Sequence, residues 1–137
     1  MRNQPEYNLQ KALCTYLGTQ FPHVRFISTG TSLKLTQAQA SRNKAIQDSK
    51  FKAPDLFIIH PKVWYDEFHL PQYYHGLWLE LKTETPYKKD GTIKKSKDDH
   101  LFLQGKSLEE LKLLGYWAEF AWSFDLCKII IDNYLKP

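Results

Sequence analysis

The sequence predicts an α/β sandwich, in which a small mixed sheet is flanked by helices. Segments with the apolar spacing of helices alternate along the chain with short apolar runs of strand length. We find no internal repeat and no linker, and 137 residues suffice for one buried core, so we expect a single domain over residues 1–137. The predicted helices are 5–19, 36–48, 100–114 and 124–135, and the predicted strands are 23–28, 55–60, 76–83 and 116–121.

The first three predicted helices rest on different signals. The first carries Leu9, Leu13 and Leu17 on one helical face, and Pro5 suits its first turn. The second is rich in alanine and glutamine, which favour a helix between strands. The third repeats leucines on one face, at Leu101, Leu108, Leu111 and Leu114.

Acidic residues accompany two of the predicted strands. Asp55 follows Pro54 at the start of an apolar run, which suits the first residue of a strand. In the next strand alternate side chains share a face, so Glu80 and Lys82 lie opposite the leucine face. That leucine face consists of Leu77, Leu79 and Leu81. Two acids and a lysine on neighbouring strands can hold a divalent metal against a phosphodiester, although each motif alone is also common as a turn or as a solvated strand face.

Two further polar residues fall on apolar helix faces. Glu6 lies three residues before Leu9 on the inward stripe of the first helix, where a capping role explains it equally well. Gln104 interrupts the leucine face of the third helix, and an inward amide needs a partner. A satisfied core glutamine is the alternative. Gly105 beside it would allow another segment to approach closely.

The ordered set of these residues resembles the PD-(D/E)XK nuclease superfamily, and more narrowly the VRR-NUC family of virus-type replication-repair nucleases. The resemblance covers roughly residues 6–135. It rests on Glu6, Pro54-Asp55, Glu80-Leu81-Lys82 and Gln104. Flanking features narrow it to the family, namely Gln39-Ala40, Lys44, Leu111 with Gly115-Tyr116, the strand Ala118-Glu119-Phe120-Ala121, and Tyr134-Leu135.

The resemblance implies a metal site and a catalytic lysine. Asp55 and Glu80 would bind Mg²⁺ or Mn²⁺, together with the backbone carbonyl of Leu81. Lys82 would act on the attacking water or on the charge of the transition state. Glu6 would be an auxiliary acid on the metal or through water.

Gln104 would support the same site. Two features depart from the family pattern: Lys52-Ala53 replaces a glycine commonly found two residues before the Pro-Asp, and the loop 61–75 is long and aromatic. Both departures bear on the choice of substrate rather than on the catalytic set.

The charge of the chain permits binding to a polyanion. The formal net charge is +4 and the pI is about 9.0. A lysine-rich segment, 87–97, directly follows the Glu80 strand, and we expect a mobile basic arm beside the site, with a merely solvated loop as the alternative. The candidate DNA-binding residues are Lys34, Arg42, Lys44, Lys88, Lys89, Lys94, Lys95 and Lys97.

The expected function is that of a Mg²⁺- or Mn²⁺-dependent deoxyribonuclease. The resemblance implies an endonuclease that selects branched, flap or four-way junction DNA, in phage or prophage DNA replication, recombination or repair. One alternative is a DNA-binding or assembly module that keeps the fold without cutting. Another is a restriction-type, sequence-specific enzyme, although no recognised DNA-reading motif is present.

The remaining signals concern packing, partners and location. Cys14 and Cys127 lack metal spacing and are expected to pack as small apolar residues. The histidines, which are His23, His60, His69, His75 and His100, show no zinc spacing. No secretory leader or membrane segment is evident, so we expect the cytoplasm of a bacterial or phage-infected cell. Three aromatic residues are expected in the core or in a homodimer patch, namely Trp117, Phe120 and Trp122.

Overall fold

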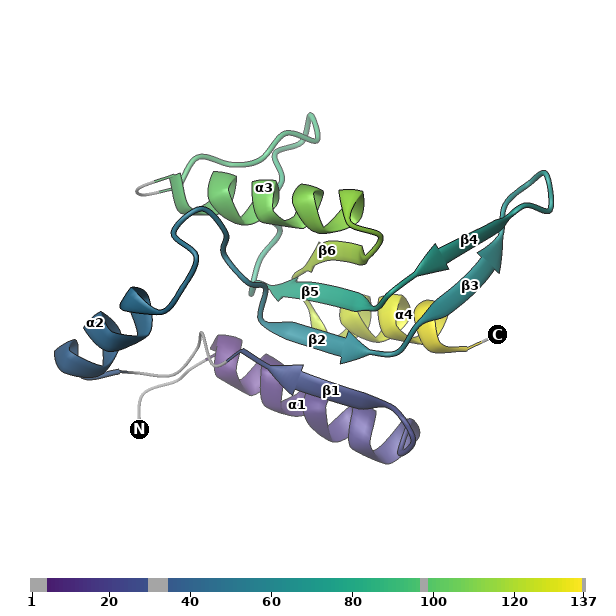
Figure 1. Cartoon of the computed structure of the whole chain (residues 1–137), viewed down its shortest axis with the longest axis horizontal. Helices are drawn as coiled ribbons and strands as arrows, with labels where there is room; N and C mark the ends of the chain where they lie inside the picture. The colour runs from purple at the N-terminus through teal and green to yellow at the C-terminus, as the bar shows by residue number, and fades with distance from the viewer. Residues whose placement is uncertain (1–4, 30–34, 97–98, 137) are drawn as a thin grey trace.

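The computed structural model describes residues 5–29, 35–96 and 99–136. It is a mixed α/β structure in which helices flank a small mixed sheet, as predicted (Figure 1). The helices are α1 (Pro5–Gln20), α2 (Gln37–Ala45), α3 (His100–Leu113) and α4 (Phe124–Leu135). The strands are β1 (Arg25–Ser28), β2 (Leu56–Ile59), β3 (Lys62–Tyr65), β4 (Pro71–Tyr74), β5 (Leu77–Leu81) and β6 (Trp117–Ala121).

The main sheet has the strand order β1-β2-β5-β6. β1 and β2 are antiparallel, as are β2 and β5, whereas β5 and β6 are parallel. A parallel pair needs a long crossover, and α3 lies within the connection between β5 and β6. In the β2–β5 ladder Leu56 lies opposite Leu79, so the first residue of β2 meets the carboxyl end of β5.

Helices cover both faces of this sheet (Figure 1). α1 and α4 pack on one face, where Leu13, Ile131 and the leucines of β5 form the larger core cluster. α3 packs on the other face through Leu108 and Leu111, against Phe120 of β6. The leucine face of β5 therefore points to α1 and α4, and the face that carries Glu80 points to α3. This assignment of the two faces confirms the predicted alternation.

The structure tests the expectations for the segment 61–75, for three aromatic residues and for the two cysteines. The segment 61–75 is not a loop, because β3 and β4 form a separate two-stranded sheet within it. Trp117, Phe120 and Trp122 pack into the two core clusters, which confirms the core alternative for them. Cys127 is fully buried, and Cys14 is partly buried beside the same core.

The described part of the lysine-rich segment, residues 87–96, contains a hydrogen-bonded turn. A bridge joins Tyr87 to Ile93, and the backbone N–H of Lys94 donates to the Pro86 carbonyl at 2.8 Å. Gly105 makes the close approach possible, since a Cβ at this position would lie 2.6 Å from the Ile93 side chain. In the described part of the chain, no helix is both long and apolar enough to cross a bilayer.

Candidate active site

Asp55 and Glu80 meet because two strands run in opposite directions. Asp55 immediately precedes β2, and the register of Leu56 with Leu79 places Asp55 opposite Glu80. Alternation sends Leu56 to the α1 face, so Asp55 and Glu80 share the α3 face with Phe57. Both acids are buried, with 8% of Asp55 and 4% of Glu80 exposed.

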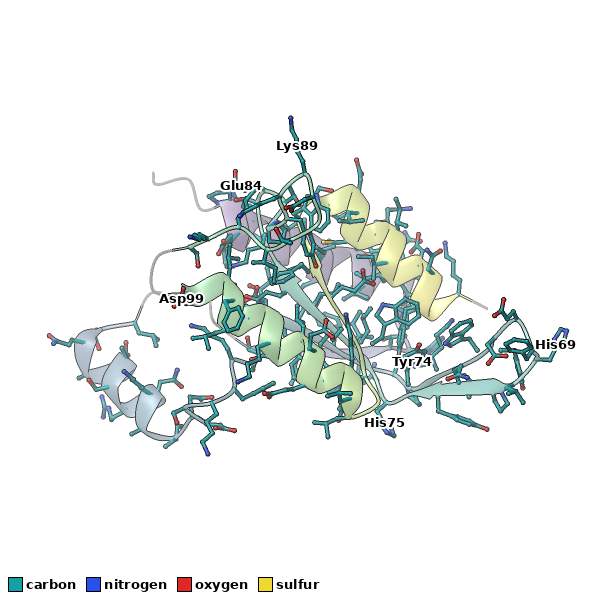
Figure 2. All side chains as sticks on the ribbon, turned by 90° about the horizontal axis from the view of Figure 1, so that it is seen from above. His69, Tyr74, His75, Glu84, Lys89 and Asp99 are labelled. Carbon is teal, nitrogen blue, oxygen red and sulfur yellow. The ribbon has the colours of Figure 1, made fainter. Side chains whose placement is uncertain are left out.

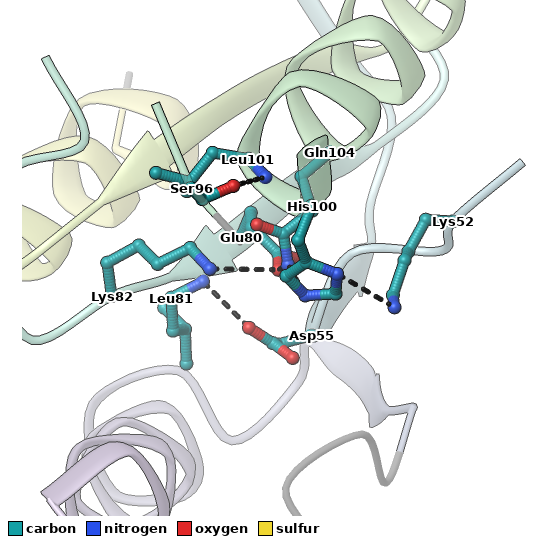
Figure 3. A network of polar contacts seen from close by, with 9 residues as sticks. All are labelled: Lys52, Asp55, Glu80, Leu81, Lys82, Ser96, His100, Leu101 and Gln104. Carbon is teal, nitrogen blue, oxygen red and sulfur yellow. Dashed lines mark hydrogen bonds and ion pairs between the residues drawn. The ribbon is translucent and has the colours of Figure 1, made fainter. Parts of the chain in front are cut away.

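α3 and the end of β5 complete a polar cluster around Glu80 (Figure 3). The side-chain amide of Gln104 donates to Oε1 of Glu80 in a short hydrogen bond. The ammonium of Lys82 lies 4.0 Å from the same oxygen and is only partly exposed. The structure therefore brings together Asp55, Glu80, Lys82 and Gln104, the four residues that the sequence analysis placed at the centre of the site.

The position of Asp55 is fixed from two sides. Its Oδ2 accepts a hydrogen bond of 2.8 Å from the backbone N–H of Leu81, which also brings the Leu81 backbone next to the carboxylates. Its own backbone carbonyl accepts a bond of 3.0 Å from the side chain of Gln10 in α1. Gln10 is buried, and the sequence analysis missed it. Its spacing of three and seven residues from Leu13 and Leu17 was the available signal.

The electrostatic environment penalises negative charge on Glu80. Burial, and after it the charge of Asp55, raises the pKa of Glu80, which stands at about 8 once every contribution is included. Lys82 and a hydrogen bond from the Asp55 backbone lower it in part. Two buried carboxylates facing one lysine therefore leave the ionised site short of positive charge.

A second group of polar residues on α3 extends the cluster outward. Nε2 of His100 lies 3.2 Å from the Gln104 amide nitrogen, and its Nδ1 lies 3.3 Å from the ammonium of Lys52. A neutral imidazole accepts at only one nitrogen, so each tautomer of His100 accepts from one of these two groups. The Ser107 hydroxyl accepts a bond of 2.9 Å from the Lys52 backbone, which ties the segment before Pro54 to α3.

The sequence analysis did not assign His100, Lys52 or Ser107 to the site. His100 was considered only as a zinc ligand, and nothing in its spacing indicated a contact with Lys52, which is 48 residues away. Its position one turn before Gln104 was the only signal.

Glu6 does not point inward as predicted. It lies in the first turn of α1 and is exposed, because the apolar stripe that contains Leu13 and Leu17 packs on the sheet only further along the helix. Its charge still reaches the site, since Glu6 contributes to the raised pKa of Glu80. The buried polar residue of this helix is Gln10.

The predicted DNA-binding residues divide into two groups. Arg42 and Lys44 lie on α2, where no residue is buried. The other described lysines lie on the turn before α3, and Figure 2 shows Lys89 extended away from the body. Lys94 and Lys95 of this turn line a surface pocket that Phe102 of α3 also lines. Lys34 and Lys97 lie outside the described residues.

This fold, a small mixed sheet flanked by helices, has a counterpart among solved structures. A solved structure described as a VRR_NUC domain protein has the same fold, with a TM-score of 0.55 and 18% sequence identity. The alignment covers 99% of this chain and 92% of that chain. No family model matches the sequence, and the comparison with curated proteins gives no match. The predicted resemblance to a VRR-NUC domain is thus confirmed at the level of the fold.

Proposed function

We propose that the protein is a Mg²⁺- or Mn²⁺-dependent DNA endonuclease that hydrolyses phosphodiester bonds. The observation that carries this proposal is the convergence of Asp55, Glu80 and Lys82 at one end of the sheet, with Gln104 of α3 on Glu80. Burial of two carboxylates in a small space, beside a partly buried lysine, is costly unless the site serves a ligand or a reaction.

The residues present fit a hard divalent cation. Mg²⁺ is commonly held by one or two carboxylates with water and substrate phosphate completing the shell, and Asp55 and Glu80 provide that pair. Burial, and after it the charge of Asp55, raises the pKa of Glu80, and a bound cation would offset both effects by stabilising the ionised carboxylate. Gln104 Oε1 is buried and lacks a hydrogen-bond partner among the described residues, which leaves one acceptor beside Glu80 for a group outside the chain.

Each side chain has a distinct role in the proposed reaction. The bound cation would neutralise phosphate charge and acidify the attacking water. Asp55 is oriented by the Leu81 N–H, and Glu80 by the Gln104 amide, so both carboxylates are held before substrate arrives. Lys82, within 4.0 Å of Glu80, stabilises the charge that develops on the phosphate or orients the water. We propose Glu6 as an outer acid that acts through water, since its side chain is exposed.

We propose that basic residues outside the polar cluster guide the DNA backbone. Arg42 and Lys44 on the exposed helix α2, and the lysines of the turn before α3, contribute charge without a base-reading element. Phosphate contacts position a duplex without reading its sequence, which favours selection by DNA structure. A role in phage or prophage replication, recombination or repair is part of the same proposal.

The proposal is tested by incubating the protein with labelled linear duplex, single strand, flap and four-way junction, in Mg²⁺, Mn²⁺ or EDTA. We expect cleavage that requires metal, is strongest on a branched substrate, and is lost in Lys82→Ala. Discrete fragments from plasmid DNA would instead indicate a restriction-type enzyme. Tight binding by wild type and Asp55→Asn, with cleavage by neither, would establish a non-catalytic module.

A further inference from the structure

Three buried side-chain atoms lack a hydrogen-bond partner among the described residues, and all three lie on the side of the sheet that carries Glu80. They are Oγ1 of Thr29, Nε1 of Trp78 and Oε1 of Gln104. Trp78 shares a face of β5 with Glu80, and the Gln104 amide donates to Glu80. A buried polar atom without a partner is costly, and a bound ion or water is a common reason for its presence. Of the three residues, Thr29 has no role in the site so far.

The ladder between β1 and β2 places Thr29 opposite Asp55. Ser28, the last residue of β1, pairs with Leu56. The next N–H along the chain, that of Thr29, donates to the Asp55 carbonyl at 3.0 Å, so the ladder continues by one pair. Opposite residues of an antiparallel ladder share a face of the sheet. The side chains of Thr29 and Asp55 therefore lie on the same face.

The preceding residue gives an independent check of this direction. The Ser28 hydroxyl lies 3.6 Å from the sulfur of Cys14 in α1, so Ser28 faces α1. Successive side chains of a strand point to opposite faces, and Thr29 therefore faces away from α1. Two consecutive hydroxyls thus lie on opposite faces of the sheet, one in contact with a helix and one beside the carboxylates.

Thr29, Asp55 and Glu80 form a row across neighbouring segments of the sheet. β1, β2 and β5 lie side by side in that order (Figure 1). Neighbouring strands are about 4.8 Å apart, so the Thr29 side chain lies beside the carboxylate pair, one strand from Asp55 and two from Glu80. A cation shared by the two carboxylates would meet Thr29 through a water rather than directly. Mg²⁺ keeps several of its waters in protein sites, which leaves room for such a contact.

We infer that Thr29 positions the cation that Asp55 and Glu80 are proposed to hold, through a hydrogen bond that its hydroxyl accepts from a water of the cation. The inference rests on the proposed function and adds a residue to its metal site. A hydroxyl is neutral, so it orients the water without adding to the negative charge of the two carboxylates. Thr29 acts through that water and is a positioning residue, not a ligand of the metal.

The first test is the affinity of the metal-free full chain for Mn²⁺, without DNA, measured at one pH from the electron paramagnetic resonance signal of free Mn²⁺. Thr29→Val keeps the shape of the side chain and removes the hydroxyl, so the dissociation constant should rise about fivefold. Thr29→Ser keeps a hydroxyl and should stay within about twofold of wild type. Ser28→Ala removes the neighbouring hydroxyl on the α1 face and is the matched control, which should leave the affinity unchanged.

Urea unfolding without metal separates this role from a structural one. The Thr29 hydroxyl is buried and has no partner among the described residues, so valine removes a polar atom without breaking a bond of the fold. The unfolding midpoint of Thr29→Val should therefore equal or exceed that of wild type, while its Mn²⁺ affinity falls. A threonine that only stabilised the fold would give the reverse, a lower midpoint with an unchanged affinity.

The inference is overturned by a Thr29→Val variant whose midpoint falls below that of wild type or whose Mn²⁺ affinity is unchanged. It is also overturned if Thr29→Ser or Ser28→Ala shares the full loss of affinity. Asp55→Asn distinguishes this failure from failure of the proposed function. If wild type binds Mn²⁺ and Asp55→Asn does not, the metal site stands and only the role of Thr29 is wrong. If both bind Mn²⁺ equally, the proposed metal site is wrong and the inference fails with it.

Discussion

Where β2 begins and β5 ends, on the face that α3 covers, polar side chains are buried. On the β3–β4 hairpin, which we call the arm, large apolar side chains are exposed. Glu80 and Gln104 are almost fully covered, while Tyr65 and Phe68 extend into solvent. Both arrangements oppose the usual distribution of residues. The buried carboxylates are held by directed hydrogen bonds between side chains and from the backbone. The exposed aromatics lie on a hairpin that its strand ladder and the hydrogen bonds to the Asp66 carboxylate hold in place. The two regions therefore differ in what stabilises them, which is a set of directed hydrogen bonds to buried carboxylates in one and a backbone ladder with the Asp66 bonds in the other.

The largest effect is expected from Asp55→Asn. Asparagine can still accept from the Leu81 N–H, so the fold should persist while the negative charge at the cation is lost. We expect single-turnover cleavage to fall by about a thousandfold or more. Glu6→Gln should cost clearly less, because Glu6 is exposed. Equal losses in the two variants would show that Glu6 is also a direct ligand.

The second prediction concerns pH and Glu80. Since the pKa of Glu80 is raised from 4.5 to about 8, its contribution to the stability of the metal-free protein is present below pH 4.5 and is lost as pH rises through about 8. Glu80→Gln has no group to ionise, so thermal unfolding of the variant relative to wild type should improve steadily between pH 5 and pH 8.5. A difference that is constant with pH would contradict the raised pKa.

Metal affinity should change in the opposite direction. Cation binding requires the ionised carboxylate, so Mg²⁺ affinity should rise about tenfold per pH unit up to about pH 8 and level off above it. Thermal shift with increasing Mg²⁺ at pH 6.5, 7.5 and 8.5 measures this. In Glu80→Gln the Mg²⁺ affinity should not rise in this way with pH.

The third prediction compares how much the polar cluster and the β3–β4 arm contribute to the free energy of unfolding. Gln104→Leu removes the donor to Glu80 and should cost about 1–3 kcal/mol in the free energy of unfolding at pH 8.5. Phe68→Ser at the tip of the arm should stay within about 0.5 kcal/mol, because the side chain is 72% exposed. Urea unfolding at one protein concentration measures both variants. A larger cost for Phe68→Ser would show that the arm is covered in solution.

Among the site variants, the smallest effect on cleavage is expected from His100→Ala. His100 contacts the Gln104 amide at 3.2 Å and so acts on Glu80 only through that amide. Loss of one such bond should slow cleavage about fivefold, without a change in DNA affinity. Lys106→Ala, an exposed change on the same helix, is the control. Weaker DNA binding in His100→Ala would assign His100 to the substrate instead.

The sequence was sufficient for the main sheet and for the centre of the site. Alternation in β5 separates the leucine face from Glu80 and Lys82, and that pattern depends only on the period of a strand. Asp55 was placed at the start of a strand by Pro54. Its position opposite Glu80 follows only once β2 and β5 are known to be antiparallel.

The rest depended on contacts that leave no local pattern. β3 and β4 bury no residue, so they lack the burial alternation by which strands are recognised. Gln10 and His100 act on groups 45 and 48 residues away, Asp55 and Lys52 respectively. The helical period alone cannot tell whether a polar residue caps the helix, is buried or is exposed. Glu6 is exposed because the first turn of α1 extends beyond the part of the helix that packs on the sheet.

The most direct test of the account is cleavage of a labelled four-way junction by wild type and Lys82→Ala, in Mn²⁺ and in EDTA. The account predicts that wild type cuts only with metal, and that Lys82→Ala binds metal and junction normally but cuts about a hundredfold to a thousandfold more slowly. Cleavage in EDTA, or an equal rate in Lys82→Ala, would contradict it.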